Sequence, residues 1–387
     1  MDKFIPLSVP NFNGNELKYL TDAVKTEWVS AGGAYVDRFE YEFAAYVNTE
    51  TAVACQSGTA GLHLALILAG VEAGHEVIAP TLTFIAAVNP VRYLNAHPVF
   101  MDCDDSLCLD MAKLKKFCQD ECHFIDNQLI NKSTGRQIKA IVVVHIFGNM
   151  AHMEAVMDIA QAYNLKVIED ATEALGTYSL AGRYQGKYTG TIADIGVYSF
   201  NGNKIITTGG GGMLVSRDPG IMKRAKYLST QAKDDAVYFR HNEIGYNYRM
   251  TNLQAALGVA QLEQLENFIA IKQQNYRIYQ SRINNGLNGL KILTFRKDIR
   301  PNYWFYSLYI ENPDKYSRKK IMESLAQDNI QTRPLWGLIH EQKPYLTNQA
   351  FMIEKAFSYY NRVVNLPCSS NLSAGDVDRV IKKISSL

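Results

Sequence analysis

The stretch IGVYSFNGNKIITTGGGGM, residues 195–213, places a lysine, Lys204, on a small polar turn. The β-type run 196–200 precedes this turn, and a glycine-rich passage after it leads into a second apolar run at 213–215. A lysine held between two buried strands differs from a solvated surface charge, because its amine can attack a carbonyl. The stretch therefore predicts Schiff-base chemistry at Lys204.

Two carboxylates end another short apolar run, KVIED at residues 166–170. An acid at the end of one strand and a lysine after a later strand are the pair that pyridoxal phosphate needs, since the lysine holds the aldehyde and the acid keeps the pyridinium nitrogen protonated. Asp170 is the predicted partner of the ring nitrogen, and Glu173 could reach the phenolic O3′. The alternative interpretation is a pair of acids at a helix start, favoured by the helix dipole.

A candidate phosphate site lies between the strand ending at Cys55 and the helix that follows it. Gly58 and Thr59 stand at the start of that helix, where free backbone N–H groups and the dipole favour an anion. The alternative is an ordinary capped helix with Ser57 or Thr59 as the N-cap. Ser199, on the strand before Lys204, offers a hydroxyl to the same phosphate.

Two ring side chains also follow predicted strands. Phe84 comes just after the run 77–79, at the sheet edge where a flat heterocycle would bind, although taken alone a core phenylalanine is the stronger interpretation. His145 ends the run 141–144 and is either close to the site or a hydrogen-bonded structural residue.

Composition narrows the class of protein. The 387 residues are 47% hydrophobic and 20% charged, which is typical of a globular chain, and the net charge of +2 favours neither nucleic acid nor a membrane surface as a partner. No apolar run approaches the roughly 20 residues of a membrane span. The 6 cysteines show no paired CxxC spacing, and Cys118, Cys122 and His123 are better interpreted as helix residues than as metal ligands, so no metal site is predicted. Free thiols and the lack of a signal-like opening predict a cytoplasmic protein.

Strand and helix signals alternate over the first two-thirds of the chain, which predicts an α/β fold with a mostly parallel sheet flanked by helices. The polar insert 120–138 interrupts the rhythm and predicts a hairpin or a loop. We expect a large domain over residues 1–250 and a smaller C-terminal α+β domain over 251–387, with a boundary somewhere in 245–285. Predicted helices include 15–26, 35–46, 60–69, 83–93, 153–163, 251–282 (as one helix or two), 317–327 and 373–384.

Taken together, several short motifs resemble one known family. They occupy residues 57–60, 83–84, 169–171, 198–200 with Lys204, 210–212 and 245–249, and weaker matches extend from Trp28 to residues 366–367. In this order they resemble the sugar-nucleotide aminotransferases of fold type I, the aspartate-aminotransferase-like enzymes that use pyridoxal phosphate. The resemblance covers nearly the whole chain.

The resemblance implies a role for each matching position. Lys204 would bind the cofactor covalently, and the cofactor ring and phosphate would be held by Asp170, Phe84, Glu173, Gly58, Thr59 and Ser199. Asn247 is similar to an asparagine that such enzymes send across a dimer interface to the partner's phosphate. The resemblance thus implies an obligate homodimer with shared sites.

One branch of this family carries histidine at the lysine position and dehydrates its substrate, so Lys204 favours transamination. Residues 6–19 and 201–204 look most like the UDP-linked 4-amino-sugar enzymes of the bacillosamine and legionaminate pathways. The implied reaction moves an amino group from L-glutamate to C4 of a 4-keto-6-deoxy nucleotide sugar, UDP-2-acetamido-2,6-dideoxy-hexos-4-ulose. The alternatives are an aminotransferase acting at C3 or on a GDP- or dTDP-linked sugar, a sugar dehydratase, or a regulator without turnover.

The sugar site is marked only by residue type. Trp28 and Trp336 could cover a ring face, and Arg249 and Arg333 could bind a carboxylate or diphosphate. Arg333 could equally belong to a structural ion pair.

Overall fold

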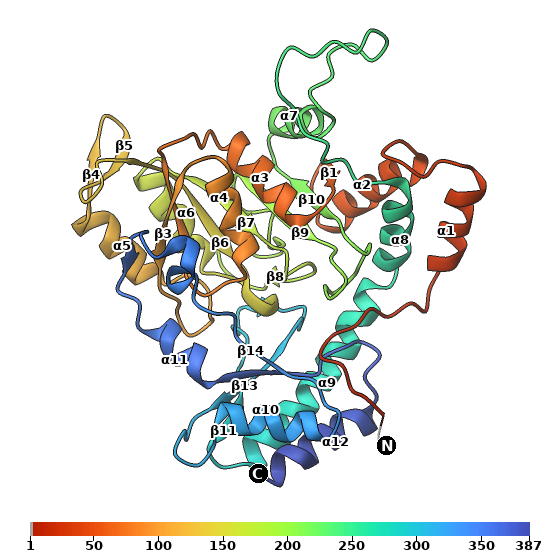
Figure 1. The fold of residues 1–387 in the computed structure, drawn as a ribbon, viewed down its shortest axis with the longest axis vertical. Coiled ribbons are helices and arrows are strands. Elements are labelled where there is room, and N and C mark those ends of the chain that lie inside the picture. Colours follow the sequence, from red (N-terminus) through yellow and green to blue (C-terminus); the bar gives the residue numbers. More distant parts are fainter. Residues whose placement is uncertain (1–2) are drawn as a thin grey trace.

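The computed structural model describes residues 3–387, which form two main sheets of unequal size joined by a long helix (Figure 1). The larger sheet has ten strands and the smaller has four. A third sheet consists of two short strands, β8 (Tyr178–Ser179) and β12 (Ile299–Arg300), which pair antiparallel. The long helix, α9 (Leu265–Gly286), runs from the larger part toward the smaller one.

The larger sheet carries the functional residues that the sequence predicts. Its strands are parallel from β9 to β15, whereas β10 runs antiparallel to both of its neighbours. This arrangement confirms the predicted α/β fold with a mostly parallel sheet. The order across the sheet is β1 (Ala52–Cys55), β10 (Gly212–Val215), β9 (Ile195–Ser199), β7 (Lys166–Asp170), β6 (Gln137–Val144), β2 (Glu76–Pro80), β3 (His97–Met101) and β15 (Ala350–Phe351).

The strands at the middle of this sheet are short and almost wholly buried, as expected of a sheet covered on both faces. Helix α3 (Gly58–Leu68) packs on β9, β10 and β7, and most of its residues are buried. The remaining helices are α1 (Glu16–Lys25), α2 (Ala34–Tyr46), α4 (Asn89–Tyr93), α5 (Met111–Asp120), α6 (Met153–Ala162), α7 (Pro219–Ser229), α8 (Asn252–Leu262), α10 (Arg318–Gln327), α11 (Lys355–Arg362) and α12 (Ala374–Ser385).

One predicted helix differs in detail from the structure, and for another the structure decides between one helix and two. The helix predicted over 83–93 is a 3₁₀ turn, Ile85–Ala87, followed by the short α4, which has Pro90 in its first turn. Proline lacks the N–H that would continue an earlier helix, and it suits a helix start. The segment 251–282 is two helices, α8 and α9, that meet at residues 263–264.

The insert 120–138 forms the predicted hairpin. Strands β4 (Cys122–Ile125) and β5 (Gln128–Asn131) pair antiparallel, and β5 continues the hydrogen bonding to β6. Both residues of the connecting turn, Asp126 and Asn127, have positive φ, which these two residue types tolerate better than most.

The smaller sheet is antiparallel and consists of β11 (Leu290–Ile292), β13 (Tyr306–Ile310), β16 (Val363–Leu366) and β14 (Arg333–Pro334). Several strand pairings cross the division predicted near residue 250, among them that of β8 with β12. Ile5 forms a parallel bridge with Ile330, and β15 returns from the C-terminal part to pair with β3. The division itself stays a prediction.

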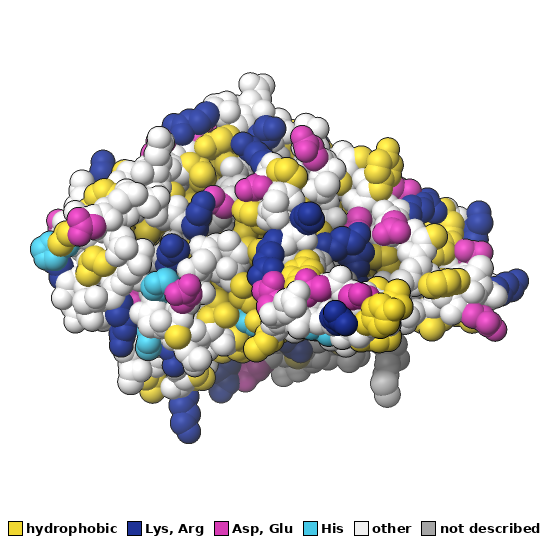
Figure 2. All heavy atoms as spheres, turned by 90° about the horizontal axis from the view of Figure 1, so that it is seen from above, with side chains coloured by type: hydrophobic (Ala, Val, Ile, Leu, Met, Phe, Trp, Pro, Cys, Tyr) yellow, Lys and Arg dark blue, Asp and Glu magenta, His cyan; other side chains and the backbone are white. Residues whose placement is uncertain are grey.

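The surface mixes charges of both signs. Figure 2 shows basic and acidic side chains interspersed over the face seen from above. Within residues 3–387, no helix combines the length and the apolar character that crossing a bilayer requires. All six cysteines are buried thiols, and burial raises the pKa of Cys118 and of Cys122 to about 12.

Candidate active site

A cavity of about 360 Å³ opens where β7 and β9 end and α3 begins. Parallel strands of an α/β sheet bring their carboxyl ends to one edge, and ligands bind there. Eight residues predicted from the sequence line this cavity: Gly58, Thr59, Phe84, Asp170, Glu173, Ser199, Lys204 and Trp336.

Lys204 stands on a turn that the backbone closes tightly. Its N–H donates to Asn201 O at 3.0 Å, and the N–H of Thr208 donates to Phe200 O at 2.9 Å. The Lys204 side chain is only 13% exposed, and its Nζ lies 3.9 Å from Oε1 of Glu173. Burial lowers the pKa of Lys204, while Glu173 and Asp170 oppose that shift. A lower pKa leaves more of the amine unprotonated, which is the form that attacks a carbonyl.

Asp170, the last residue of β7, is almost fully buried. Its Oδ1 accepts a hydrogen bond from the N–H of Thr172 at 3.0 Å. Burial raises the pKa of Asp170, while Thr172, Lys204 and His145 oppose that shift. A protonated pyridine nitrogen beside this carboxylate would supply a hydrogen bond and a countercharge, so Asp170 fits its predicted role.

The neighbouring carboxylate, Glu169, has a structural role. Successive strand residues face opposite sides of a sheet, and Glu169 accepts hydrogen bonds from the N–H groups of residues 190, 192 and 193. His145 Nε2 lies 3.0 Å from Glu169 Oε2, and His145 Nδ1 accepts from the N–H of Ala151 at 3.2 Å. Both ring nitrogens of His145 are therefore bonded, as in the structural alternative.

The second carboxylate of the cavity, Glu173, is held by a backbone amide. Its Oε2 accepts a hydrogen bond of 2.8 Å from the N–H of Phe147, and burial raises its pKa to about 7. Phe147 has a positive φ of 55°, which is unusual for a large side chain, so its surroundings must fix this conformation. The fixed amide keeps one carboxylate oxygen of Glu173 in place.

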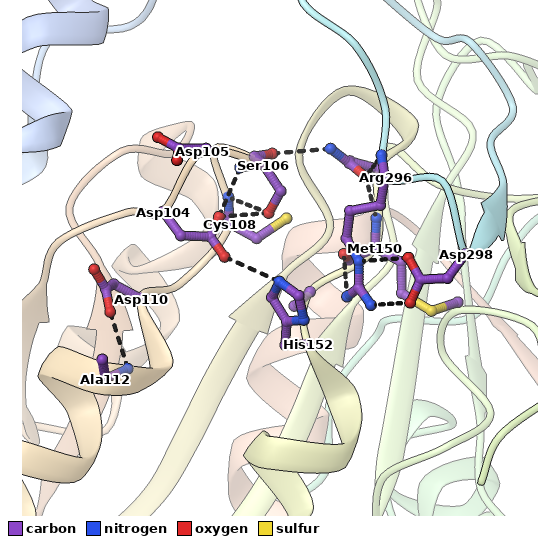
Figure 3. Close-up of polar contacts among 12 residues, drawn as sticks. Asp104, Asp105, Ser106, Cys108, Asp110, Ala112, Met150, His152, Arg296 and Asp298 are labelled. Atoms are coloured by element: carbon purple, nitrogen blue, oxygen red, sulfur yellow. Dashed lines mark hydrogen bonds and ion pairs between the residues drawn. The ribbon is translucent and has the colours of Figure 1, made fainter. Parts of the chain in front are cut away.

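The segment that carries Phe147 is anchored by a polar network around residues 104–110 and 296–298 (Figure 3). His152 Nε2 lies 3.5 Å from Asp104 Oδ2, and Arg296 Nη1 donates to Met150 O at 3.2 Å. Arg296 is itself paired with Asp298. This network holds residues 150 and 152, which follow Phe147 closely in the chain.

The start of α3 offers a bare backbone to an anion. Ser57 is the N-cap, and its Oγ accepts from the N–H of Ala60 at 3.1 Å. Gly58 and Thr59 follow in the first turn, where helical N–H groups lack partners within the helix. A Cβ built on Gly58 would lie 2.9 Å from Cβ of Ser199, so only glycine fits between the two segments. The capping interpretation and the phosphate interpretation are thus compatible, because Ser57 caps the helix while the next two residues line the cavity.

Four predicted residues lie outside the cavity of a single chain. Trp28 is 62% exposed, and Arg333 and Asn247 are also exposed. We expected Arg249 to bind a carboxylate or diphosphate of the substrate. It is instead buried and paired with Glu40, so its guanidinium does not face a substrate in this cavity. The predicted role of Asn247 concerns a partner subunit and stays a prediction.

The structure adds a residue that the sequence did not suggest. Trp304 lines the cavity, and Lys204 Nζ lies 4.3 Å from the centre of its ring. Asn201, Asn203 and Thr172 also line the cavity. The sequence predicts a strand over residues 303–310, but Trp304 precedes the observed β13, and its distance from Lys204 in the sequence gives no sign that it reaches the lysine.

Comparisons with known proteins agree with this geometry. A model of the DegT/DnrJ/EryC1/StrS aminotransferase family matches residues 10–385. GDP-perosamine synthase of Escherichia coli O157:H7 is 36% identical over 383 residues, covering 99% of this chain and 98% of that protein. GDP-perosamine synthase of Caulobacter vibrioides is 35% identical, covering 97% and 96%.

A solved structure shows the same fold. PseC of Helicobacter pylori, an aminotransferase involved in the biosynthesis of pseudoaminic acid, superposes with a TM-score of 0.87 at 24% identity, covering 99% of each chain. The family match spans all the residues that line the cavity, Lys204 and Asp170 among them. The chain therefore belongs to the DegT/DnrJ/EryC1/StrS family and is a pyridoxal phosphate-dependent nucleotide-sugar aminotransferase.

Proposed function

We propose that this enzyme transfers the amino group of L-glutamate to C4 of a nucleotide-linked 4-keto-6-deoxy sugar. The observation that carries the proposal is the placement of Lys204 in one cavity with the buried Asp170 and Glu173. A single amine beside two carboxylates can remove a proton in one half of the reaction and return it in the other.

Each side chain has a physical task in this scheme. When bound, pyridoxal phosphate supplies the aldehyde that accepts the amino group and the ring that takes up electrons. Lys204 would hold the aldehyde carbon and, once released, would move the proton, and Asp170 would keep the ring nitrogen protonated. Gly58, Thr59 and Ser199 would hold the phosphate at the start of α3.

The aromatic side chains would bind flat and apolar surfaces. The rings of Phe84 and Trp336 are tilted by 52° with their centres 6.1 Å apart, and Trp336 also packs on Phe147 at 5.0 Å. Phe84 comes from the larger part of the molecule and Trp336 from the C-terminal part, so the two parts meet at this edge of the cavity. We assign Phe84 to the cofactor ring and Trp336 to the sugar.

The nucleotide has two candidates with different support. Motif resemblance at residues 6–19 and 201–204 favours a UDP-linked sugar. The relatives named GDP-perosamine synthase, at 35–36% identity over nearly the whole chain, favour a GDP-linked sugar. The chemistry at C4 is the same for both, because the keto group that receives the amine lies on the sugar.

A second copy of the chain would complete the site. Among the described residues that line the cavity, Lys204 is the only basic one, yet a nucleotide diphosphate needs positive charge. The loop after α7 stands out from the body of the molecule (Figure 1) and carries four exposed apolar side chains, Val237, Tyr238, Phe239 and Ile244. An exposed apolar cluster of this kind is typical of an interface, and the loop also carries Lys233 and Arg240. We propose a homodimer in which this loop and Asn247 reach the partner's cavity.

The test is a substrate comparison with purified enzyme loaded with pyridoxal phosphate. L-glutamate is supplied with GDP-, UDP- or dTDP-linked 4-keto-6-deoxy sugars, and mass spectrometry detects the amino sugar and 2-oxoglutarate together. We expect conversion of at least one of them, with the amine at C4 by NMR. Lys204→Ala and Lys204→Arg should give no product, and full turnover by either variant would refute the role of Lys204. An amine at C3, or loss of water without amination, would refute the proposed reaction.

A further inference from the structure

We propose that Trp304 is a positioning residue for Lys204, and that the face of its indole ring holds the lysine ammonium whenever that amine is not bonded to the cofactor. The inference rests on the proposed function of Lys204. Its basis is the distance of 4.3 Å between Lys204 Nζ and the ring centre, which is within the range of a cation–π contact.

Trp304 is fixed to the same turn that carries the lysine. It is only 2% exposed, and its indole N–H donates to Asn203 O at 2.8 Å. Asn203 immediately precedes Lys204, so the indole binds the lysine turn with its edge and the lysine ammonium with its face. The ring also stacks on Phe305, with centres 4.0 Å apart and planes 9° from parallel, which prevents it from turning away.

A single buried asparagine joins Trp304 to Glu173. Asn302 Oδ1 accepts from the N–H of Trp304 at 2.9 Å, while its Nδ2 donates to Glu173 O at 3.0 Å and to Leu175 O at 2.9 Å. Tyr303, between Asn302 and Trp304, has a positive φ of 57°. These bonds fix the backbone that aims the indole at the lysine.

Asn302 also packs tightly against Gly148. A Cβ built on Gly148, next to the Phe147 amide that binds Glu173, would lie 1.9 Å from Asn302 Oδ1. Asn302 therefore packs closely against Gly148, where a side chain would not fit, while it bonds to the backbone of Glu173 and of Trp304. Their positions relative to Lys204 are coupled through the backbone and through Asn302.

An aromatic face suits an amine that must be released and recaptured. A carboxylate in direct contact would bind the ammonium strongly and hold its protons, whereas the nearest carboxylate oxygen, on Glu173, is 3.9 Å away. The ring attracts the ammonium but accepts no conventional hydrogen bond from it, so the neutral amine is free to turn toward the aldehyde. We infer that Trp304 keeps Lys204 beside the cofactor between the two halves of the reaction.

The test measures the protonation of Lys204 and needs no sugar substrate. Full-length enzyme is freed of cofactor, and the rate at which added pyridoxal phosphate becomes covalently linked to Lys204 is followed by absorbance as a function of pH. The pH dependence reports the pKa of the amine. Replacing the indole removes an interaction that favours the ammonium, so Trp304→Leu should lower that pKa by roughly 0.5–1.5 pH units. Trp304→Phe keeps a ring face and should lower it by less.

A second series keeps the shape and the indole N–H. Tryptophan bearing one, two or more fluorine atoms is incorporated at position 304, which weakens the negative face of the ring without removing packing. The pKa of Lys204 should fall stepwise with each fluorine, whereas a purely structural role predicts no change. A constant pKa across the fluorinated series would overturn the inference. If the unsubstituted enzyme fails to link the cofactor at all, the proposed function fails instead, so the two failures are distinguishable.

Discussion

Lys204 Nζ and Glu173 Oε1 lie 3.9 Å apart inside a cavity that shields both from water. Burial acts on the two groups in opposite directions, because it disfavours whichever form is charged. It lowers the pKa of the Lys204 amine and raises that of the Glu173 carboxyl to about 7. Each group favours the charged form of the other, so their mutual attraction opposes the effect of burial on both.

Replacing Glu173 by glutamine should change how the stability of the cofactor-free protein depends on pH. Glu173 has a folded-state pKa of about 7 against an ordinary 4.5, so the stability that its proton provides is complete below pH 4.5 and is lost as pH rises through 7. That loss amounts to about 3 kcal/mol at most. Glu173→Gln carries no such proton. The free energy of unfolding of the variant minus that of the wild type should therefore increase from pH 5 to pH 8.

Denaturant unfolding at the two pH values provides the measurement. Glu72→Gln is the matched control, because Glu72 is exposed and its substitution should shift stability equally little at both values. Equal differences from wild type at pH 5 and pH 8 for Glu173→Gln would contradict the raised pKa.

Adding one methyl group at Gly58 should block the phosphate cradle. The new Cβ would meet Cβ of Ser199 at 2.9 Å and Cγ2 of Thr172 at 3.1 Å, and both residues line the cavity. We expect Gly58→Ala to weaken the binding of pyridoxal phosphate at least about tenfold, which corresponds to about 1.4 kcal/mol. Gly202→Ala is the control, since a Cβ there has no neighbour within 4 Å. Cofactor titration followed by absorbance measures both, and equal affinities would remove Gly58 from the phosphate site.

The sequence predicted the part of the site that lies along the sheet. Asp170 and Ser199 end adjacent parallel strands, and Gly58 opens the helix packed on them, so strand order and polarity suffice to bring them together. Lys204 follows from the same argument, because its turn leaves β9 directly. Each of these positions depends on local patterns and on one rule about parallel sheets.

The rest of the site depends on contacts between distant segments. Trp304 contacts Lys204 directly and is joined to the backbone of Glu173 by Asn302, and no local pattern in the sequence predicts either contact. Arg249 shows the opposite error, since a basic residue in a family motif looks available to a substrate until its burial against Glu40 is known. Side-chain burial is a property of the folded chain, and residue type alone does not predict it.

Removing the Arg249 side-chain charge should destabilise the protein rather than weaken sugar binding. Arg249 also donates to Ala54 O at 3.2 Å, and its loss would leave the buried Glu40 carboxylate without its main partner. Breaking a buried pair from one side commonly costs about 3–5 kcal/mol, so Arg249→Met should unfold at clearly lower denaturant concentration.

Two further variants separate stability from binding. Arg333→Met should change stability by less than about 0.5 kcal/mol, because Arg333 is exposed. The double variant Glu40→Met with Arg249→Met should recover much of the loss, since neither charge remains buried. A stable Arg249→Met enzyme with a raised KM for the nucleotide sugar would instead show that Arg249 binds the substrate.

Mixing an inactive variant with a strongly impaired one should raise activity above that of either if the sites are shared between subunits. Asn247 is exposed and lies outside the cavity of its own chain, whereas Lys204 lines it. Asn247→Ala should weaken cofactor binding and turnover, and Lys204→Ala should abolish turnover. In a mixed dimer, one site would carry both defects and the other would carry neither. After denaturation and refolding of an equal mixture, about a quarter of all sites should be intact, by random pairing into twofold dimers. Each variant refolded alone is the control. Because an Asn247 that serves its own subunit would leave a defect in every site, a mixture no more active than its parts would refute the shared arrangement.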